Sequence, residues 1–160
     1  MKRIAIGDKA PDFALFSQGR EQVRLSDFLG RNNVVLYFYP KDFSAGCTAE
    51  AKAFRDSYQI FADSETELIG VSSDSVESHR RFSEHCGLPF NLLSDVGKAV
   101  RELYGVSGRW ISGRVTFIID KQGIVRNVFS SQLHPTQHVR EALETLRVQA
   151  SQPPSQPVPA

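Results

Sequence analysis

The chain contains 160 residues with a formal net charge of +1 at pH 7, and 41% of its residues are hydrophobic. This length suits a single globular domain with a buried core. Lysines and arginines are spread too evenly along the chain to predict a nucleic-acid partner. No apolar run approaches the roughly 18 residues that a membrane span requires, so no membrane partner is expected.

The N-terminal segment and the cysteine content bear on the compartment. Segment 1–8 has too little apolar content for a secretory signal. The chain has two cysteines, which suit catalysis in a reducing compartment better than a disulfide scaffold, so we expect a cytoplasmic protein. No cluster of cysteine and histidine has metal-ligand spacing, and neither a metal nor a cofactor is expected.

Strand-like and helix-like segments alternate along the chain. The apolar run Val34–Tyr39 predicts a central strand buried on both faces. After it, apolar residues recur near the helical period and predict a helix that starts around Cys47 and packs one face on the sheet. The predicted elements that follow are a strand over 67–72, a helix over 75–85, a strand around 90–93, a helix capped by Asp95 and running to Tyr104, a hairpin of strands 115–119 and 124–129, and a last helix over about 136–148.

This alternation predicts an α/β sandwich. We expect one domain over residues 1–148. The tail 149–160 is rich in proline and poor in apolar residues, and we expect it to be disordered.

A single cysteine, Cys47, lies where the apolar strand is expected to give way to a helix. The first turn of a helix leaves backbone N–H groups unpaired and carries a partial positive charge, which stabilises anions. Such a position, especially beside a cation, favours a reactive thiolate. Cys47 is therefore a candidate nucleophile. The alternative is an ordinary buried thiol that packs as a small hydrophobe.

The residues around this cysteine form a recognisable pattern. Pro40, Ser44 and Cys47 make Pro-x-x-x-Ser-x-x-Cys directly after the strand-like run, and this resembles the signature of the peroxiredoxins. The run 38–43 with Gly46-Cys47-Thr48 resembles the bacterioferritin-comigratory, or Q-type, branch of these AhpC/TSA-like proteins. Two further segments carry the resemblance, which extends from Ile4 to Arg147: the opening segment 7–13 and the strand 114–120. The resemblance implies a thioredoxin-like fold, a central mixed sheet flanked by helices, with an N-terminal extension.

The resemblance also implies roles for individual residues. Cys47 is the peroxidatic thiolate, which attacks a peroxide and becomes a sulfenic acid. Arg114 stabilises the thiolate and holds the peroxide through its donor fork, and Ser44 hydrogen-bonds both. Pro40 limits the access of water. The backbone N–H groups of Gly46 and Cys47 add further donors.

Each of these residues has a simpler explanation. Pro40 could end the strand, Ser44 could cap the helix, and Arg114 could be a surface charge. Arg109 is a second possible cation, and Arg114 is preferred because its Arg-Val-Thr-Phe context resembles the strand that bears the family's arginine.

Supporting residues are Tyr39, Phe43 and Glu50. Glu50 lies in the first helical turn, where an acid suits the helix dipole. Phe43 and Trp110 are candidates to line the approach to the site, although packing would explain both. The histidines have no partner that can be read from the sequence, so solvated or structural roles are expected for His79, His85, His134 and His138.

The second cysteine, Cys86, is the candidate resolving residue. Many Q-type relatives carry the resolving cysteine five residues after the peroxidatic one, where this chain has Lys52. Another subset places it in the later helix, and Cys86 ends that helix here. A disulfide needs Cα atoms about 4.4–6.8 Å apart, and if the two helices hold the cysteines farther apart than this, both helix ends must unravel. The alternative is a structural Cys86, with an external thiol resolving the sulfenic acid.

The leading hypothesis is a monomeric antioxidant thiol peroxidase that reduces hydrogen peroxide and organic hydroperoxides and is recycled by thioredoxin or a similar dithiol. A thioredoxin-type disulfide oxidoreductase is disfavoured because Cys47 has no partner in Cys-x-x-Cys spacing. A redox sensor or holdase would use the same chemistry without turnover. A glutathione-peroxidase-like enzyme fits the fold, but its motif around the nucleophile differs.

Overall fold

The computed structural model describes residues 3–106, 114–131 and 134–151, so Arg109 and Trp110 lie outside the described residues. A seven-stranded sheet forms the centre, in the order β2-β1-β5-β4-β3-β6-β7. The strands are β1 (Ala14–Ser17), β2 (Gln22–Arg24), β3 (Asn33–Phe38), β4 (Thr66–Ser72), β5 (Asn91–Ser94), β6 (Val115–Ile119) and β7 (Val125–Ser130). The helices are the 3-10 helix η1 (Leu25–Phe28), α1 (Ala45–Asp56), α2 (Tyr58–Asp63), α3 (Val76–Cys86), α4 (Ala99–Leu103) and α5 (Gln137–Ser151).

Strand β3 lies inside the sheet and is buried along its whole length. It pairs in parallel with β4 and antiparallel with β6, and Phe38 at its end lies opposite Val115 at the start of β6. The sheet is therefore mixed, and the predicted central strand and the β6–β7 hairpin are both confirmed.

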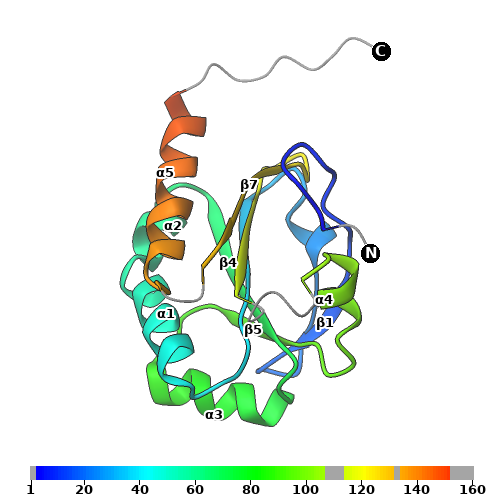
Figure 1. Cartoon of the computed structure of the whole chain (residues 1–160), viewed down its shortest axis with the longest axis vertical. Helices are drawn as coiled ribbons and strands as arrows, with labels where there is room; N and C mark the ends of the chain where they lie inside the picture. The colour runs from blue at the N-terminus through cyan, green and yellow to red at the C-terminus, as the bar shows by residue number, and fades with distance from the viewer. Residues whose placement is uncertain (1–2, 107–113, 132–133, 152–160) are drawn as a thin grey trace.

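Helices cover both faces of the sheet, which explains why β3 is apolar throughout. Val35 and Tyr37 pack in one cluster with side chains of α1, α2, α3 and α5, whereas Leu36 and Phe38 pack in the other with η1 and α4. Figure 1 shows α1, α2 and α5 on one side of the strands and α4 on the other.

Three elements differ from expectation. The hairpin β1–β2 was not predicted, because these strands are only 4 and 3 residues long and half exposed. The helix after Cys47 is divided at Ser57, whose ψ of 5° interrupts the helical backbone. The last helix continues to Ser151, past its expected end at Val148, so the disorder expected over 149–160 is wrong for residues 149–151; the remainder of that tail, 152–160, lies outside the described residues.

The predicted cap of α4 is present in an unexpected geometry. Lys98 occupies the N-cap position with a left-handed φ of 61°. The carboxylate of Asp95 nevertheless accepts hydrogen bonds from the N–H groups of Val100 at 3.2 Å and Arg101 at 2.9 Å. Asp95, which lies outside the helix, thus provides hydrogen-bond acceptors for the unpaired N–H groups of its first turn.

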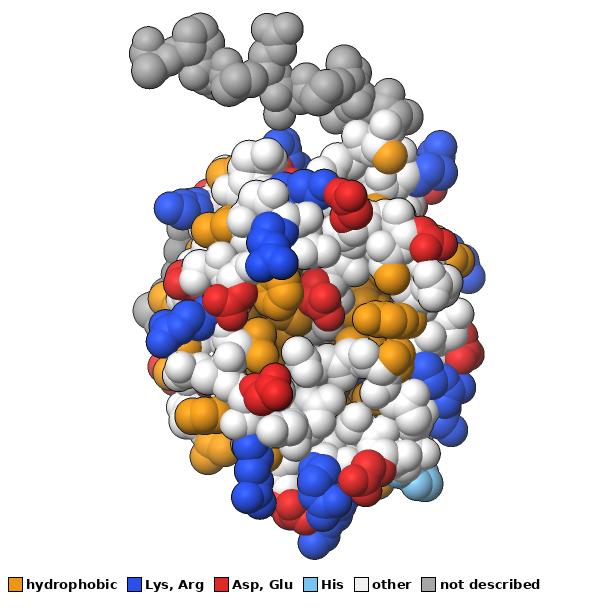
Figure 2. Space-filling model, turned by 180° about the vertical axis from the view of Figure 1, so that it is seen from behind, with side chains coloured by type: hydrophobic (Ala, Val, Ile, Leu, Met, Phe, Trp, Pro, Cys, Tyr) orange, Lys and Arg blue, Asp and Glu red, His pale blue; other side chains and the backbone are white. Residues whose placement is uncertain are grey.

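Acidic and basic side chains are interspersed over the face seen in Figure 2, without a large patch of one sign. Within the described part of the chain, no helix is long and apolar enough to cross a membrane.

The sheet packs tightly around Gly70 in β4. A Cβ there would lie 2.8 Å from Cζ of Tyr37 and 2.9 Å from Cδ2 of Leu92. We expect Gly70→Ala to lower the free energy of unfolding by about 1–3 kcal/mol, because these side chains must shift in a full core. Urea denaturation measures this. Gly97→Ala, which places a Cβ in open space, should change stability by less than about 1 kcal/mol, and equal losses would contradict the packing argument.

Candidate active site

Cys47 lies in the first turn of α1 and is 1% exposed. Ser44 is the N-cap of this helix: its Oγ accepts a hydrogen bond from the Cys47 N–H at 3.4 Å and donates to the Lys41 carbonyl at 3.1 Å. The Ser44 proton therefore points toward Lys41 in this state and not toward the sulfur. This is the capping geometry considered above as the simpler explanation for Ser44.

A buried guanidinium joins the sulfur to a buried carboxyl group. Arg114, directly before β6, donates from Nη2 to Sγ of Cys47 at 3.3 Å and from Nη1 to Oε1 of Glu50 at 2.7 Å. A Cβ at Gly46 would approach Nη2 to 3.0 Å, so glycine leaves room for the arginine. The structure thus brings together the predicted site residues Gly46, Cys47, Glu50 and Arg114. Arg114 is buried and is not a surface charge.

Burial raises the pKa of Glu50 to about 8, although the charge of Arg114 acts to lower it. Its second oxygen, Oε2, has no hydrogen-bond partner among the described residues and lies 3.6 Å from Nδ1 of His138. Burial thus favours the protonated form of Glu50, and in that form the carboxyl group leaves the positive charge of Arg114 to the Cys47 sulfur.

His138 extends the site toward α5. Its Nε2 donates to the Ser131 carbonyl at 2.8 Å, and its Nδ1 accepts from the Thr116 hydroxyl at 2.7 Å. Burial lowers the pKa of His138 to about 4, so the ring is neutral at pH 7. The neutral ring adds no positive charge beside Arg114.

A second buried network fixes the loop that precedes Cys47. The carboxylate of Asp42 accepts hydrogen bonds from the hydroxyls of Tyr39 at 2.6 Å and Ser78 at 2.9 Å, and from Nδ1 of His79 at 2.7 Å. Nε2 of His79 faces the Leu93 carbonyl at 2.9 Å. Both ring nitrogens face acceptors, and Nδ1 is bonded to the buried Asp42 carboxyl group. This pair ties the loop to α3.

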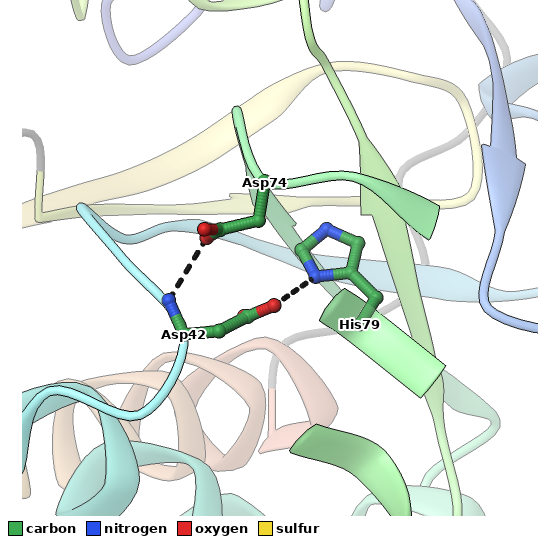
Figure 3. A group of neighbouring side chains, drawn as sticks. All are labelled: Asp42, Asp74 and His79. Carbon is green, nitrogen blue, oxygen red and sulfur yellow. Dashed lines mark hydrogen bonds and ion pairs between the residues drawn. The ribbon is translucent and has the colours of Figure 1, made fainter. Parts of the chain in front are cut away.

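Figure 3 shows Asp42, Asp74 and His79 converging from the loop after β3, the loop after β4 and the start of α3. Their potential ligand atoms lie within 4.8 Å of one another. Asp74 Oδ2 accepts from the Asp42 N–H at 2.9 Å and from the Ser72 hydroxyl at 2.6 Å. Protein donors thus already occupy these oxygens, and we assign the cluster a structural role.

The other predicted residues lie around this centre. Pro40 is half-buried, and Tyr39 is buried with its hydroxyl on Asp42. Phe43 is 50% exposed and has a φ of 67°, in the left-handed region that a bulky residue rarely adopts. Its ring packs on Phe82 of α3 at a centroid distance of 5.2 Å. Phe43 therefore joins the loop to α3 while leaving half of its surface to solvent.

Cys86 is buried at the end of α3, and both cysteines are free thiols. Burial raises the pKa of Cys86, while the positive charges of Lys52 and Arg55 act to lower it. Nη1 of Arg55 donates to the Cys86 carbonyl at 2.6 Å. The structure therefore brings cations of α1 to the second cysteine.

Sequence reasoning missed the contributions of Asp42, His79, His138 and Arg55. A signal existed for His79, because it shares the apolar face of α3 with Phe82 and Cys86 at helical spacing. A histidine on such a face needs buried partners. The partners of His138 and Arg55 come from distant segments, and no local pattern indicates them.

A buried cysteine at a helix N-terminus, joined to a buried arginine on a mixed sheet covered by helices, defines a thiol-dependent oxidoreductase. The AhpC/TSA family model matches residues 6–128. A rice (Oryza sativa subsp. japonica) protein named peroxiredoxin Q, chloroplastic, is 43% identical over 148 residues, which cover 91% of this chain and 68% of the rice protein. The chain belongs to the AhpC/TSA family of peroxiredoxins, on its peroxiredoxin Q branch, and is a peroxidase.

Solved structures confirm the thioredoxin-like peroxiredoxin fold. The peroxidoxin BcpB of Mycobacterium tuberculosis superposes with a TM-score of 0.85 at 36% identity, covering 91% of this chain and 98% of that one. The bacterioferritin comigratory protein of Xanthomonas campestris, described by its alkyl peroxide reduction activity, gives 0.79 at 28% identity, covering 92% of this chain and 99% of that one.

The relatives contradict the expected cytoplasmic location. The rice protein and other curated relatives are named chloroplastic, so their names do not agree with a cytoplasmic assignment. The expectation was wrong because the use of free thiols indicates a reducing environment without distinguishing one reducing compartment from another.

The pKa of Glu50 predicts a loss of activity at alkaline pH. As pH rises through about 8, Glu50 loses its proton, and its carboxylate then competes with the Cys47 sulfur for Arg114. We expect the rate of the first reaction with peroxide to fall about three- to tenfold between pH 7 and pH 9. Glu50→Gln, which cannot ionise, should remove this decline.

Stopped-flow measurement of peroxide reduction across this pH range checks the effect. Glu102→Gln, a change at an exposed residue of α4, serves as the control and should keep the wild-type profile. An unchanged decline in Glu50→Gln would show that another group titrates.

Proposed function

We propose that this enzyme reduces hydrogen peroxide and organic hydroperoxides through a sulfenic acid on Cys47, and that it serves antioxidant defence and redox homeostasis. The observation that carries the proposal is the 3.3 Å contact between Arg114 Nη2 and Cys47 Sγ at the N-terminus of α1. The alkyl peroxide reduction named for the Xanthomonas campestris relative supports organic hydroperoxides as substrates.

In the first step, the Cys47 thiolate attacks one oxygen of the peroxide. The S–O bond forms as the O–O bond breaks, sulfur is oxidised by two electrons, and the other oxygen leaves as water or an alcohol after taking a proton. Arg114 is placed to stabilise the thiolate and then the negative charge that develops on the leaving oxygen. Ser44 orders the loop through its bonds to Cys47 N and Lys41 O. Pro40 at the start of this loop limits water access.

In the second step, the Cys86 thiol condenses with the sulfenic acid. An S–S bond forms, the S–O bond breaks, and the hydroxyl leaves as water with the thiol proton. A dithiol such as thioredoxin then reduces the disulfide. The two free cysteines share one core cluster, which supports this pairing. We further propose that the protein acts as a monomer.

Cysteine variants test the proposal in an assay that couples peroxide consumption to thioredoxin, thioredoxin reductase and NADPH. Wild type should turn over and lose the mass of two hydrogens after one peroxide equivalent, Cys47→Ser should be inactive, and Cys86→Ser should stall as a sulfenic acid. Normal turnover of Cys86→Ser would show that an external thiol resolves the intermediate. Oxidation of Cys47 without turnover, even with reductant, would favour a redox sensor.

A conservative change tests the role of the arginine. Arg114→Lys keeps the charge but loses the planar fork that reaches both Cys47 and Glu50. We expect the rate of sulfenic acid formation to fall about 10- to 100-fold. Arg140→Lys, at an exposed position of α5, is the matched control and should retain the wild-type rate. Equal rates in both variants, measured by stopped flow, would remove Arg114 from the mechanism.

A further inference from the structure

The helices that carry the two cysteines are joined by a contact that has no part in the two proposed catalytic steps. Arg55, in the last turn of α1, donates from Nη1 to the carbonyl of Cys86 at 2.6 Å. The last carbonyl groups of a helix have no partner within it. Cys86 is the last residue of α3, and Gly87 turns the chain away with a φ of 64°. Arg55 therefore caps the end of α3 from a neighbouring helix.

This contact holds Cys86 toward the far end of α1. Arg55 follows Cys47 by eight residues in that helix, a rise of about 12 Å at 1.5 Å per residue. A disulfide requires Cα atoms about 4.4–6.8 Å apart. While the Cys86 carbonyl is bound to Arg55, the end of α3 is tied to a residue in the last turn of α1, and we expect this bond to break before the two sulfurs meet.

The hydrogen bonds between α3 and the Cys47 segment lie earlier in α3, whereas the ring of Phe43 also lies 5.7 Å from that of His85 in the last turn. Asp42 binds Ser78 and His79 in its first half, and Phe43 packs on Phe82. The Asp42 contacts can persist while the final turn of α3 opens. Arg55 thus acts on the part of α3 that has to move.

We propose that Arg55 is a positioning residue that slows the second half-reaction by holding Cys86 until the end of α3 detaches. This inference rests on the proposed function, in which Cys86 resolves the sulfenic acid. A held Cys86 prolongs the life of that sulfenic acid. A second peroxide can then oxidise Cys47 further, with transfer of one oxygen to give a sulfinic acid and release of water or an alcohol.

A purely electrostatic role predicts the opposite effect. Arg55 and Lys52 are both cations whose charges favour the Cys86 thiolate. If Arg55 acted only through its charge, its removal would slow the condensation. If it acts as a restraint, its removal accelerates the condensation. Lys52→Met removes a similar charge but leaves the hydrogen bond from Arg55 to the Cys86 carbonyl in place, so it is the matched control.

The experiment mixes reduced full-length protein with one equivalent of hydrogen peroxide, quenches the thiols with an alkylating agent at set times, and counts thiol, sulfenic acid and disulfide by intact mass. We expect Arg55→Met to form the sulfenic acid at the wild-type rate and the disulfide about 5- to 20-fold faster. Arg55→Lys, which retains one donor group, should form the disulfide at a rate between those of wild type and Arg55→Met. Lys52→Met should form the disulfide no faster than wild type. At excess peroxide, Arg55→Met should accumulate less sulfinic acid.

The outcomes distinguish failure of the proposed function from failure of the proposed role of Arg55. A wild type that forms no sulfenic acid, or forms it without a disulfide, refutes the proposed function and the role of Arg55 with it. A wild type that forms both, together with an Arg55→Met variant that condenses no faster, refutes the role of Arg55 alone. Arg55 is partly exposed, with 34% of its side chain accessible, so its variants should fold, and Arg55→Lys decides the sign of the effect if Arg55→Met does not.

Discussion

The buried guanidinium of Arg114 is the group on which the active site depends. A charge taken out of water is costly unless it has partners, and Arg114 finds them in the Cys47 sulfur and the Glu50 carboxyl group. The pairing register of β3 with β6 places Arg114 beside these two residues. Phe38 pairs with Val115, so the residue before β6 lies beside the end of β3, where the chain turns toward α1. One antiparallel pairing thus places a cation, 67 residues away in sequence, at the first turn of the helix.

The loop between β3 and α1 needs a second restraint, because it carries a left-handed Phe43 and no regular hydrogen bonding. The buried Asp42–His79 pair supplies it. Such a buried hydrogen bond contributes modestly to net stability, yet loss of one partner leaves the polar atoms of the other unsatisfied at a cost of roughly 1–3 kcal/mol. The pair therefore fixes one arrangement of the loop relative to α3 more than it adds to the stability of the whole fold. Both cysteines are thereby held on a common scaffold.

Local patterns in the sequence predicted the elements that local physics determines. The uninterrupted apolar run revealed β3, and Ser75 and Gly87 bounded α3 through their capping preferences. The motif residues Ser44, Gly46 and Cys47 also fell where expected. What could not be predicted depends on tertiary contacts: the short β1–β2 hairpin gains its partner from β5, and Glu50 acquires its raised pKa only when α5 and β6 bury it. Polar residues such as His138 look solvent-exposed in the sequence until their buried partners are known.

Lysine at position 52 has an energetic consequence for the proposed cycle. With no thiol on the same helix, the disulfide must join two helices and close a loop from Cys47 to Cys86. Loop closure of this size stabilises the oxidised form by about 4 kcal/mol on the chain-entropy model. Against this stand the loss of the charged bond from Arg55 to Cys86 and of the packing around two buried cysteines, worth about 2–5 kcal/mol together. These contributions nearly cancel, so the reduced and oxidised forms are expected to have similar free energies of unfolding, which suits a proposed cycle that passes through both forms at every turnover.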